Sequence, residues 1–256
     1  MSEDADLTGR VAVVTGGASG IGRATCLLLA RRGARVAVVD LDRDGGAAVA
    51  TEIAAEGGEA LFFPADVSRS EDCGSVVGET ERALGPIGVL VNAAGVIHRG
   101  SALETTDEDW ERLMAVNVGA AFRMARAVLP GMIARGRGAV VNVASGWGLV
   151  GGPRAAAYCA SKGAVVQLTR ALAIDHGPDG VRVTCVCPGD TDTPMLRQEA
   201  RELGEDEAAF LAGAADRPLG RVGCPEEVAE AIAWLAGEGA SFVTGTCLVV
   251  DGGGLA

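Results

Sequence analysis

Short runs of β-branched and other apolar residues recur along the chain, separated by longer segments rich in Ala, Leu, Glu and Arg. Within each run hydrophobicity is almost continuous, as in strands covered on both faces, rather than alternating with polar residues. The runs predict seven strands, at residues 10–15, 35–40, 59–66, 87–95, 138–145, 181–189 and 247–253. The segments between them have the length and composition of crossover helices, among them helices at 20–32 and 156–176.

Strands that alternate with helices in this way predict an α/β fold, a doubly wound parallel sheet of about seven strands with helices on both faces. No linker, change of composition or internal repeat divides the chain, so we expect a single domain over residues 1–256. Residues 190–223 interrupt the alternation before a helix that starts near Pro225. Because this long insertion follows the carboxyl end of a strand, we expect it to form a lid over a substrate.

The formal net charge of -12 argues against nucleic acid or an anionic membrane as a partner, since both require basic patches. The N-terminus "MSEDADLTGR" lacks the basic and apolar regions of an export signal, and no apolar run is long enough to span a membrane. The seven cysteines form no CxxC pair and no Cys/His cluster. We therefore expect a cytoplasmic protein with scattered, buried thiols and no metal site.

A glycine-rich loop, "TGGASGIGRAT", follows the first predicted strand and opens the first predicted helix. Gly16 would allow a tight turn, Gly20 the close approach of a pyrophosphate, and Gly22 close packing of helix on strand. The amide groups at the helix N-terminus would add hydrogen-bond donors and a partial positive charge. In this context the loop predicts a dinucleotide-binding site.

The second predicted strand ends in an acid, Asp40, about 20 residues beyond the loop. A carboxylate there can accept hydrogen bonds from both hydroxyl groups of the adenosine ribose and would repel a 2′-phosphate. Arg43 could instead cover a phosphate, but an exposed arginine at a helix start is the better interpretation, and the loop itself holds no basic residue near Gly16. The sequence favours NAD over NADP as the cofactor.

The spacing TGxxxGxG from Thr15, together with "NAAG" at 92–95 and Y-x-x-x-K at 158–162, resembles the short-chain dehydrogenase/reductase family. The resemblance extends from Val11 to Gly253 and keeps the order of the family's motifs. It implies a Rossmann-like fold and an NAD(P)-dependent oxidoreductase that acts on CH–OH groups. It also implies a homotetramer, with the fourth and fifth helices and the C-terminal strand at the interfaces.

The resemblance also assigns roles to individual residues. It implies a catalytic group formed by Asn117, Ser145, Tyr158 and Lys162. Ser145 is the only serine candidate, because "ASGWG" lacks the second serine of many relatives. The implied cofactor contacts beyond the glycines and Asp40 are Ser19, Ile21, Asp66, Val67, Asn92, Ala93, Gly95, Tyr158, Lys162, Pro188, Gly189 and Thr193, with Thr191 as an alternative or additional contact.

Tyr158 is the only tyrosine of the chain, and Lys162 follows it by four residues. On a helix both side chains would share a face. The lysine ammonium and the positive nicotinamide of an oxidised cofactor would lower the pKa of the phenol toward neutrality, where it could act as a general acid and base. Ser145 would then orient the substrate oxygen, and Asn117 would help to anchor a water that passes the proton onward.

The identity of the substrate is the property that the sequence specifies least. The residues expected to face it are mainly apolar or small: Gly146, Trp147, Leu149, Gly152, Thr191, Met195, Leu196 and Phe210. Arg154 and Arg197 are expected to be solvated rather than paired with a substrate anion, and His98 could also touch the substrate. The pattern favours a neutral secondary alcohol, cyclic or alicyclic, and its ketone.

Two alternatives stay open. The first is a 3-oxoacyl thioester reductase, which would ordinarily use NADPH and basic residues near the glycine-rich loop. The second is a non-catalytic NAD-sensing regulator on the same fold, which would ordinarily have lost the tyrosine or the lysine. Both Tyr158 and Lys162 are present here.

Overall fold

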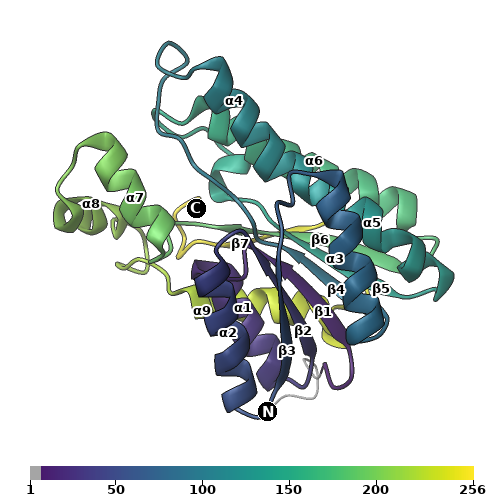
Figure 1. Ribbon diagram of the computed structural model, residues 1–256. Coiled ribbons are helices and arrows are strands. Elements are labelled where there is room, and N and C mark those ends of the chain that lie inside the picture. Colours follow the sequence, from purple (N-terminus) through teal and green to yellow (C-terminus); the bar gives the residue numbers. More distant parts are fainter. Residues whose placement is uncertain (1–6) are drawn as a thin grey trace.

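A computed structural model describes residues 7–256 (Figure 1). Within that range seven parallel strands form one sheet in the order β3-β2-β1-β4-β5-β6-β7. The strands are β1 (Val11–Thr15), β2 (Arg35–Asp40), β3 (Glu59–Pro64), β4 (Ile87–Asn92), β5 (Gly138–Val143), β6 (Val181–Pro188) and β7 (Cys247–Val250). The predicted doubly wound α/β fold is therefore confirmed.

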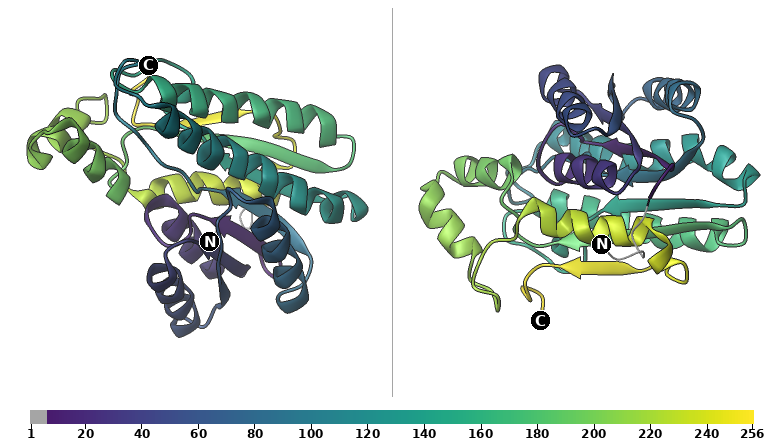
Figure 2. Two further views of the ribbon diagram at one scale, coloured as in Figure 1. Left: turned by 45° about the horizontal axis from the view of Figure 1, so that its top comes forward. Right: turned by 90° about the horizontal axis from the view of Figure 1, so that it is seen from below.

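Helices cover both faces of the sheet (Figures 1 and 2). One face is covered by α1 (Gly20–Arg31), α2 (Arg43–Ala55) and α9 (Pro225–Ala236), and the other by α3 (Ser70–Ala83), α5 (Ala120–Ala134) and α6 (Ala156–His176). Along β1, Ala12 and Val14 pack on the first face and Val11 and Val13 on the second. This two-sided burial explains why the strands are hydrophobic without interruption.

The sheet is wound outward from β1 in two directions. The chain runs from β1 through β2 to β3 at one edge, then returns to place β4 on the other side of β1. The loops after β1 and β4 therefore leave the sheet in opposite directions, which opens a crevice at the carboxyl ends of these strands.

The helix that follows β4 is not regular. It begins as α4 (Asp107–Leu113), capped by Thr106, whose hydroxyl accepts from the Asp109 amide at 3.1 Å. It continues through a π-helical turn, η2 (Met114–Gly119), directly into α5. Asn117, which is buried, lies in this turn. A π-helical turn inside an α-helix is often found at a functional site.

Residues 190–223 leave the body of the domain, at the left of Figure 1. They carry two short helices, α7 (Pro194–Leu203) and α8 (Glu207–Ala214). Thr193 caps α7 by accepting from the Leu196 amide, and Gly204 ends it in the left-handed conformation with φ of 69°. The excursion begins at the carboxyl end of β6, as the sequence predicts.

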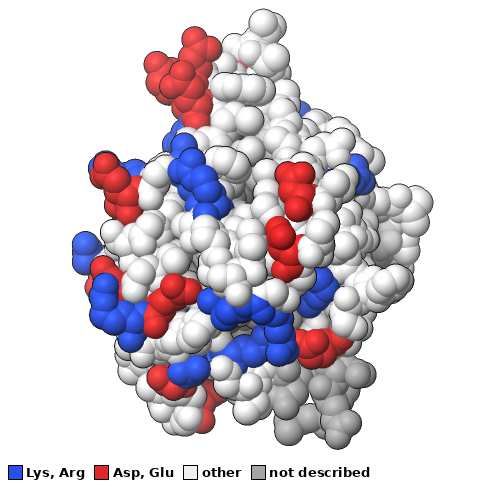
Figure 3. Space-filling model, turned by 90° about the vertical axis from the view of Figure 1, so that its right-hand side faces the viewer, with Lys and Arg blue, Asp and Glu red and all other residues white. Residues whose placement is uncertain are grey.

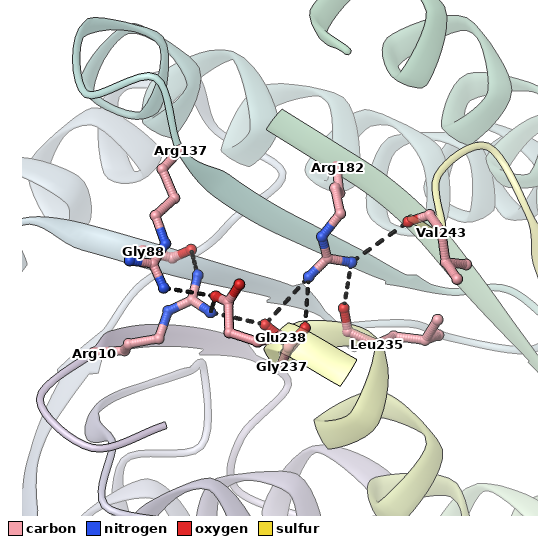
Figure 4. Close-up of polar contacts among 9 residues, drawn as sticks. Arg10, Gly88, Arg137, Arg182, Leu235, Gly237, Glu238 and Val243 are labelled. Atoms are coloured by element: carbon pink, nitrogen blue, oxygen red, sulfur yellow. Dashed lines mark hydrogen bonds and ion pairs between the residues drawn. The ribbon is translucent and has the colours of Figure 1, made fainter. Parts of the chain in front are cut away.

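At the opposite end of the strands, where β1 and β6 begin, arginines satisfy the last carbonyls of α9 (Figure 4). Arg182 donates to the carbonyls of Leu235, Ala236 and Gly237, and Arg10 donates to that of Ala236 at 3.0 Å. Glu238 pairs with Arg137 at 2.6 Å. In Figure 3, which looks at this side of the molecule, basic side chains lie next to acidic ones.

Some strands are shorter than predicted. The apolar runs 59–66, 87–95 and 247–253 overrun β3, β4 and β7, because the chain leaves the sheet there to line the crevice. Residues 1–6, on which part of the argument about an export signal rests, lie outside the described residues. Among residues 7–256, no helix is both long and apolar enough to cross a membrane.

Candidate active site

A cavity of about 430 Å³ opens at the carboxyl ends of the central strands. Most of the residues predicted to bind cofactor or substrate line it. They are Gly16, Ser19, Gly20, Ile21, Gly22, Asp40, Asp66, Val67, Ala93, Gly95, Ser145, Trp147, Tyr158, Lys162, Pro188, Gly189, Thr191, Thr193 and Met195. Asn92 and Asn117 lie behind this wall rather than in it.

The β1–α1 loop comes too close to neighbouring backbone for side chains at two of its glycines. Gly16 has φ of 68°, and a Cβ there would lie 2.7 Å from the backbone nitrogen of Ala94. A Cβ on Gly22 would lie 2.0 Å from the carbonyl oxygen of Gly16. The loop therefore presents bare backbone to the cavity, which a pyrophosphate needs for close approach.

Two further features fit a dinucleotide. Ser19, at the N-cap of α1, makes no side-chain hydrogen bond to the first turn, so the amide groups there remain available for an anion. Asp40 is held rigidly, because its carboxylate accepts from the amides of Ala18 at 2.9 Å and Asp42 at 3.0 Å. Arg43 is exposed at the start of α2 and does not line the cavity.

A ladder of buried polar side chains supports the floor of the cavity. The Asn92 amide donates to Asn142 Oδ1 at 2.8 Å, and the Asn142 amide donates to Thr169 Oγ1 at 2.8 Å. These contacts join β4, β5 and α6, so Asn92 steadies the sheet from behind the cavity. Asp66 lies at the rim, where its Oδ1 accepts from the Ser68 amide and hydroxyl.

The three residues expected to act on the substrate converge from two elements. Ser145 follows β5, and its Oγ accepts from the Trp147 amide at 3.1 Å. Tyr158 and Lys162 lie one turn apart on α6, whose observed bounds match the predicted helix. Lys162 Nζ donates to the carbonyl of Val143 at 2.9 Å and lies 5.7 Å from the centroid of the Tyr158 ring.

Asn117 supports the Tyr158–Lys162 segment of α6 from the side away from the cavity. Its amide donates to the carbonyl of Val96 and to Ser161 Oγ, both at 2.9 Å, and its Oδ1 accepts from the Val96 amide at 2.8 Å. Both amide hydrogens are thus used within the protein. The side chain fixes the loop that follows β4, and only Oδ1 keeps capacity to accept a hydrogen bond from a water.

Burial dominates the electrostatics of the pair on α6. It raises the pKa of the Tyr158 phenol above its usual range, while a hydrogen bond with Ser145 opposes the rise. Burial lowers the pKa of Lys162 to about 8, while the nearby thiols of Cys187 and Cys185 raise it. In the protein alone the phenol is therefore protonated at neutral pH. Lys162 by itself does not bring this pKa toward neutrality, because burial disfavours phenolate and ammonium alike, and the predicted lowering depends on the positive nicotinamide as well.

The loop after β6 forms the side of the cavity opposite Gly20. Thr193 of this loop lies close to Gly20, since a Cβ on Gly20 would be 3.1 Å from Thr193 Cγ2. Thr191 is buried, and its hydroxyl donates to the Gly189 carbonyl at 3.0 Å. Both threonines left open by the sequence line the cavity.

The substrate end of the cavity has an apolar wall. The Trp147 ring meets the Tyr158 ring edge-on, with centroids 6.2 Å apart, and Met195 and Leu196 of α7 complete the wall. Several residues expected to face the substrate do not line the cavity. They are Leu149, Gly152, Phe210 and His98. Arg154 pairs with Glu104 and Arg197 with Asp192 at exposed positions, as predicted for solvated arginines.

The sequence analysis missed a buried ion pair beside this wall. Arg99 Nη1 lies 2.7 Å from Glu199 Oε2, and the two side chains are only 7% and 9% exposed. Glu199 lines the cavity. A signal was present, because Leu196, Glu199 and Ala200 are spaced to share one face of α7, and all three are buried. The partner Arg99 is 100 residues away and could not be inferred.

Three thiols that looked scattered in the sequence meet behind Lys162. The sulfur atoms of Cys185, Cys187 and Cys247 all lie within 4.8 Å of one another. Cys185 and Cys187 share one face of β6, and Cys247 of β7 is the register partner of Cys185. This cluster was not foreseen from the sequence, because strand pairing brings Cys247 from a distant part of the chain to Cys185 and Cys187.

Comparisons with known proteins agree with the fold. A family model described as enoyl-(acyl carrier protein) reductase matches residues 16–254. The chain is 41% identical to 2-(S)-hydroxypropyl-CoM dehydrogenase 3 of Xanthobacter autotrophicus, with 96% of this chain and 97% of that protein covered. It is 40% identical to cyclopentanol dehydrogenase of Comamonas testosteroni, with 95% and 96% covered.

Solved structures give the same result. A short-chain type dehydrogenase/reductase from Mycobacterium marinum superposes with a TM-score of 0.90 at 33% identity, covering 97% of this chain and 96% of that one. A protein from Beutenbergia cavernae, proposed to be a NAD(P)-dependent gluconate 5-dehydrogenase and holding NADP at low occupancy, superposes with a TM-score of 0.91 at 39% identity, covering 98% and 99%. With the TGxxxGxG loop and the Tyr158–Lys162 pair lining one cavity, this chain belongs to the short-chain dehydrogenase/reductase family.

Proposed function

We propose that this protein is an NAD-dependent oxidoreductase that interconverts a neutral secondary alcohol, cyclic or alicyclic, and its ketone. The observation that carries the proposal is a single cavity lined both by the dinucleotide-binding loop and by Ser145, Tyr158 and Lys162. Relatives of the chain act by name on cyclopentanol and on a chlorinated cyclohexadiene diol, which supports an alcohol as the substrate.

Tyr158 serves as the general acid and base. The bound nicotinamide supplies the carbon that accepts or donates hydride. In the oxidative direction Tyr158 takes the hydroxyl proton while the substrate carbon becomes a carbonyl carbon, and in the reductive direction it returns that proton. Ser145, whose hydroxyl group acts to lower the pKa of the phenol, orients the substrate oxygen. Lys162 contributes an ammonium close to the ring that favours phenolate.

Asn117 acts as a positioning residue in this scheme. Its side chain accepts from the Val96 amide and donates to the Val96 carbonyl. These two hydrogen bonds fix the loop that lines the cavity beside Tyr158. The remaining lone pair of its Oδ1 can accept from a water that carries the proton toward Lys162. A Cβ on Gly95 would lie 3.4 Å from both Asn117 Oδ1 and Lys162 Nζ, so the two groups border the same space beside this glycine.

We further propose that NAD is preferred to NADP. The support is the fixed carboxylate of Asp40 at the rim of the cavity and the position of Arg43 outside it. A 2′-phosphate beside Asp40 would place two negative charges side by side. The alternatives, a thioester reductase and an NAD-sensing regulator, have less support, since the first calls for basic residues near the loop and the second for loss of Tyr158 or Lys162.

The homotetramer and the cytoplasmic location stay predictions. Exposed apolar side chains lie on the elements that the family resemblance assigns to subunit interfaces. They are Trp110 of α4, Phe122 and Ile133 of α5, and Val249 of β7. Apolar side chains of this size are ordinarily covered when they belong to an interface, so they support association of identical chains.

The test is to measure NAD reduction with cyclic alcohols, steroids, sugars and 3-hydroxyacyl thioesters, using the wild type and Tyr158→Phe. We expect turnover of a cyclic alcohol by the wild type and loss of nearly all turnover in the variant, with NADH binding almost unchanged. Wild-type activity in Tyr158→Phe would refute the acid–base role. Fast oxidation of a thioester with NADP would favour the reductase, and saturable NADH binding without turnover would favour the regulator.

A further inference from the structure

A buried carboxyl group faces the substrate end of the cavity. Glu199 of α7 is buried and lines the same cavity as Tyr158 and Ser145. Its Oε2 accepts from Arg99 Nη1 at 2.7 Å, whereas no donor within the described residues reaches its Oε1. An ionised carboxylate can accept hydrogen bonds on both oxygens, and Oε1 is not among the polar atoms that are fully buried without a partner, so it faces the open volume of the cavity. A molecule that displaces water from this volume must therefore supply a donor to Oε1 or leave that oxygen without one, which is costly.

The position of this carboxyl group is fixed. Arg99, its partner, donates to the carbonyls of Arg154 at 3.3 Å and Pro153 at 3.0 Å, and its guanidinium lies 4.9 Å from the centroid of the Trp147 ring. Glu199 is thus held against a guanidinium that is itself anchored to the loop before α6. A carboxylate fixed in this way can select a ligand by the position of its donor.

The charge of the pair determines which donor fits. The guanidinium of Arg99 neutralises Glu199, so the pair as a whole attracts neither an anion nor a cation. A neutral donor suits it best, and a hydroxyl group can both donate to Oε1 and remain uncharged. The same argument disfavours a substrate amine, which would bring an unbalanced charge into a largely apolar cavity.

Glu199 and the reactive phenol face the same volume. The Trp147 ring lies between them, because it meets the Tyr158 ring edge-on and lies against the guanidinium of Arg99, which holds Glu199. The carboxylate is also close enough to raise the pKa of the phenol. The wall next to them is apolar, with Met195 and Leu196. A ligand with two polar ends and an apolar body matches this arrangement.

We propose that Glu199 accepts a hydrogen bond from a second hydroxyl group of the substrate, and hence that the preferred substrate is a diol of which the other hydroxyl reacts at Tyr158. The proposal rests on the function proposed above and narrows its substrate class. Neutral monohydric alcohols would still react, but they would leave Oε1 of Glu199 without a donor. Discrimination against them follows from that loss.

The experiment compares cyclohexanol with the cis and trans isomers of cyclohexane-1,2-diol, -1,3-diol and -1,4-diol as substrates, with NAD and above pH 7. The proteins are the wild type, Glu199→Gln and the matched control Glu202→Gln. Glu202 lies on the same helix and accepts from the Arg99 amide at 3.1 Å, but it is exposed and outside the cavity lining. Melting temperature and NADH binding show whether each variant is folded.

We expect the wild type to oxidise at least one diol with kcat/KM roughly tenfold or more above that for cyclohexanol. This factor corresponds to the free energy of one hydrogen bond to a charged group. Glu199→Gln should lose most of this preference, measured as the ratio of kcat/KM for the diol to that for cyclohexanol, and Glu202→Gln should keep the preference. The isomer that is preferred would give the spacing between the two hydroxyl groups.

Two results would overturn the inference while leaving the proposed oxidoreductase intact. One is equal use of cyclohexanol and all diols by the wild type. The other is an equal fall for both substrate classes in Glu199→Gln, which would mean that Glu199 only holds α7 in place. If no alcohol is oxidised, the proposed function fails instead. Glu199 is then still tested by thermal shift with NADH, since a diol must stabilise the wild type more than Glu199→Gln, and equal shifts would refute the inference.

Discussion

The carboxylate of Asp40 offers a sharp test of cofactor choice. Asp40→Asn removes its negative charge and nearly preserves its shape. In the wild type both oxygens accept backbone amide hydrogen bonds, from Ala18 and Asp42, so the carboxylate cannot turn away from a ligand at the rim of the cavity. The substitution should therefore raise the efficiency with NADP much more than it lowers the efficiency with NAD.

The magnitude follows from Coulomb's law. Two unit charges about 4 Å apart interact by about 1 kcal/mol in water and about 4 kcal/mol near a protein surface. Asp40 is half-buried and the cavity is open to solvent, so about 2 kcal/mol is a reasonable value for each charge pair. Since 1.4 kcal/mol is a factor of ten, the ratio of kcat/KM for NADP over NAD should rise roughly 30-fold.

The assay measures kcat/KM with both cofactors on one alcohol, at low and at high ionic strength. Salt should reduce the discrimination of the wild type, because it screens charges near solvent, and should hardly change that of Asp40→Asn. A wild type that prefers NADP, or a ratio that the substitution leaves unchanged, would refute the electrostatic argument.

Two further predictions concern stability. Asn142→Leu removes the 2.8 Å hydrogen bonds to Asn92 and Thr169 and leaves the buried Asn92 amide with only its long 3.4 Å contact to the Ala121 carbonyl. The free energy of unfolding should therefore fall by roughly 2–4 kcal/mol. Urea unfolding checks this, and a wild-type midpoint would contradict it. Burial raises the pKa of Glu199 from 4.5 to about 7. Between pH 4.5 and about 7 the folded protein therefore holds a proton that the unfolded chain releases, and the free energy of unfolding falls as pH rises. Over this pH range Glu199→Gln should gain stability relative to the wild type, and a difference in stability between the two proteins that does not change with pH would argue against the raised pKa.

Local sequence signals were enough for the elements and for the cofactor end of the site. The helix that carries Tyr158 and Lys162 has the predicted bounds, and the loop of Gly16 and Gly22 joins a strand to a helix as expected. These features depend on hydrophobic runs and on residues close together in the chain. Strand ends were predicted less well, because apolar residues continue past the last ladder hydrogen bonds into the loops that line the cavity.

The polar part of the substrate end could not be predicted in the same way. Glu199 meets Arg99 only because α7 folds back over the loop that follows β4. The cluster of Cys185, Cys187 and Cys247 likewise depends on the pairing of β6 with β7. The protonation of Tyr158 depends on burial, which no short motif reports. Contacts between distant segments need the folded chain.

The π-helical turn at Met114–Gly119 has a consequence for how this protein can change over evolution. Such a turn holds one residue more than an α-helical turn, and each residue rotates a helix by about 100°. The extra residue lets Asn117 point toward Ser161 while the apolar side of the next helix, α5, still packs on the sheet. Deleting one residue there would give a more regular helix, but either Asn117 would rotate away from Ser161 or the apolar side of α5 would rotate away from the sheet. In this segment, length is therefore constrained as strictly as residue identity, and insertions and deletions should be rarer than substitutions.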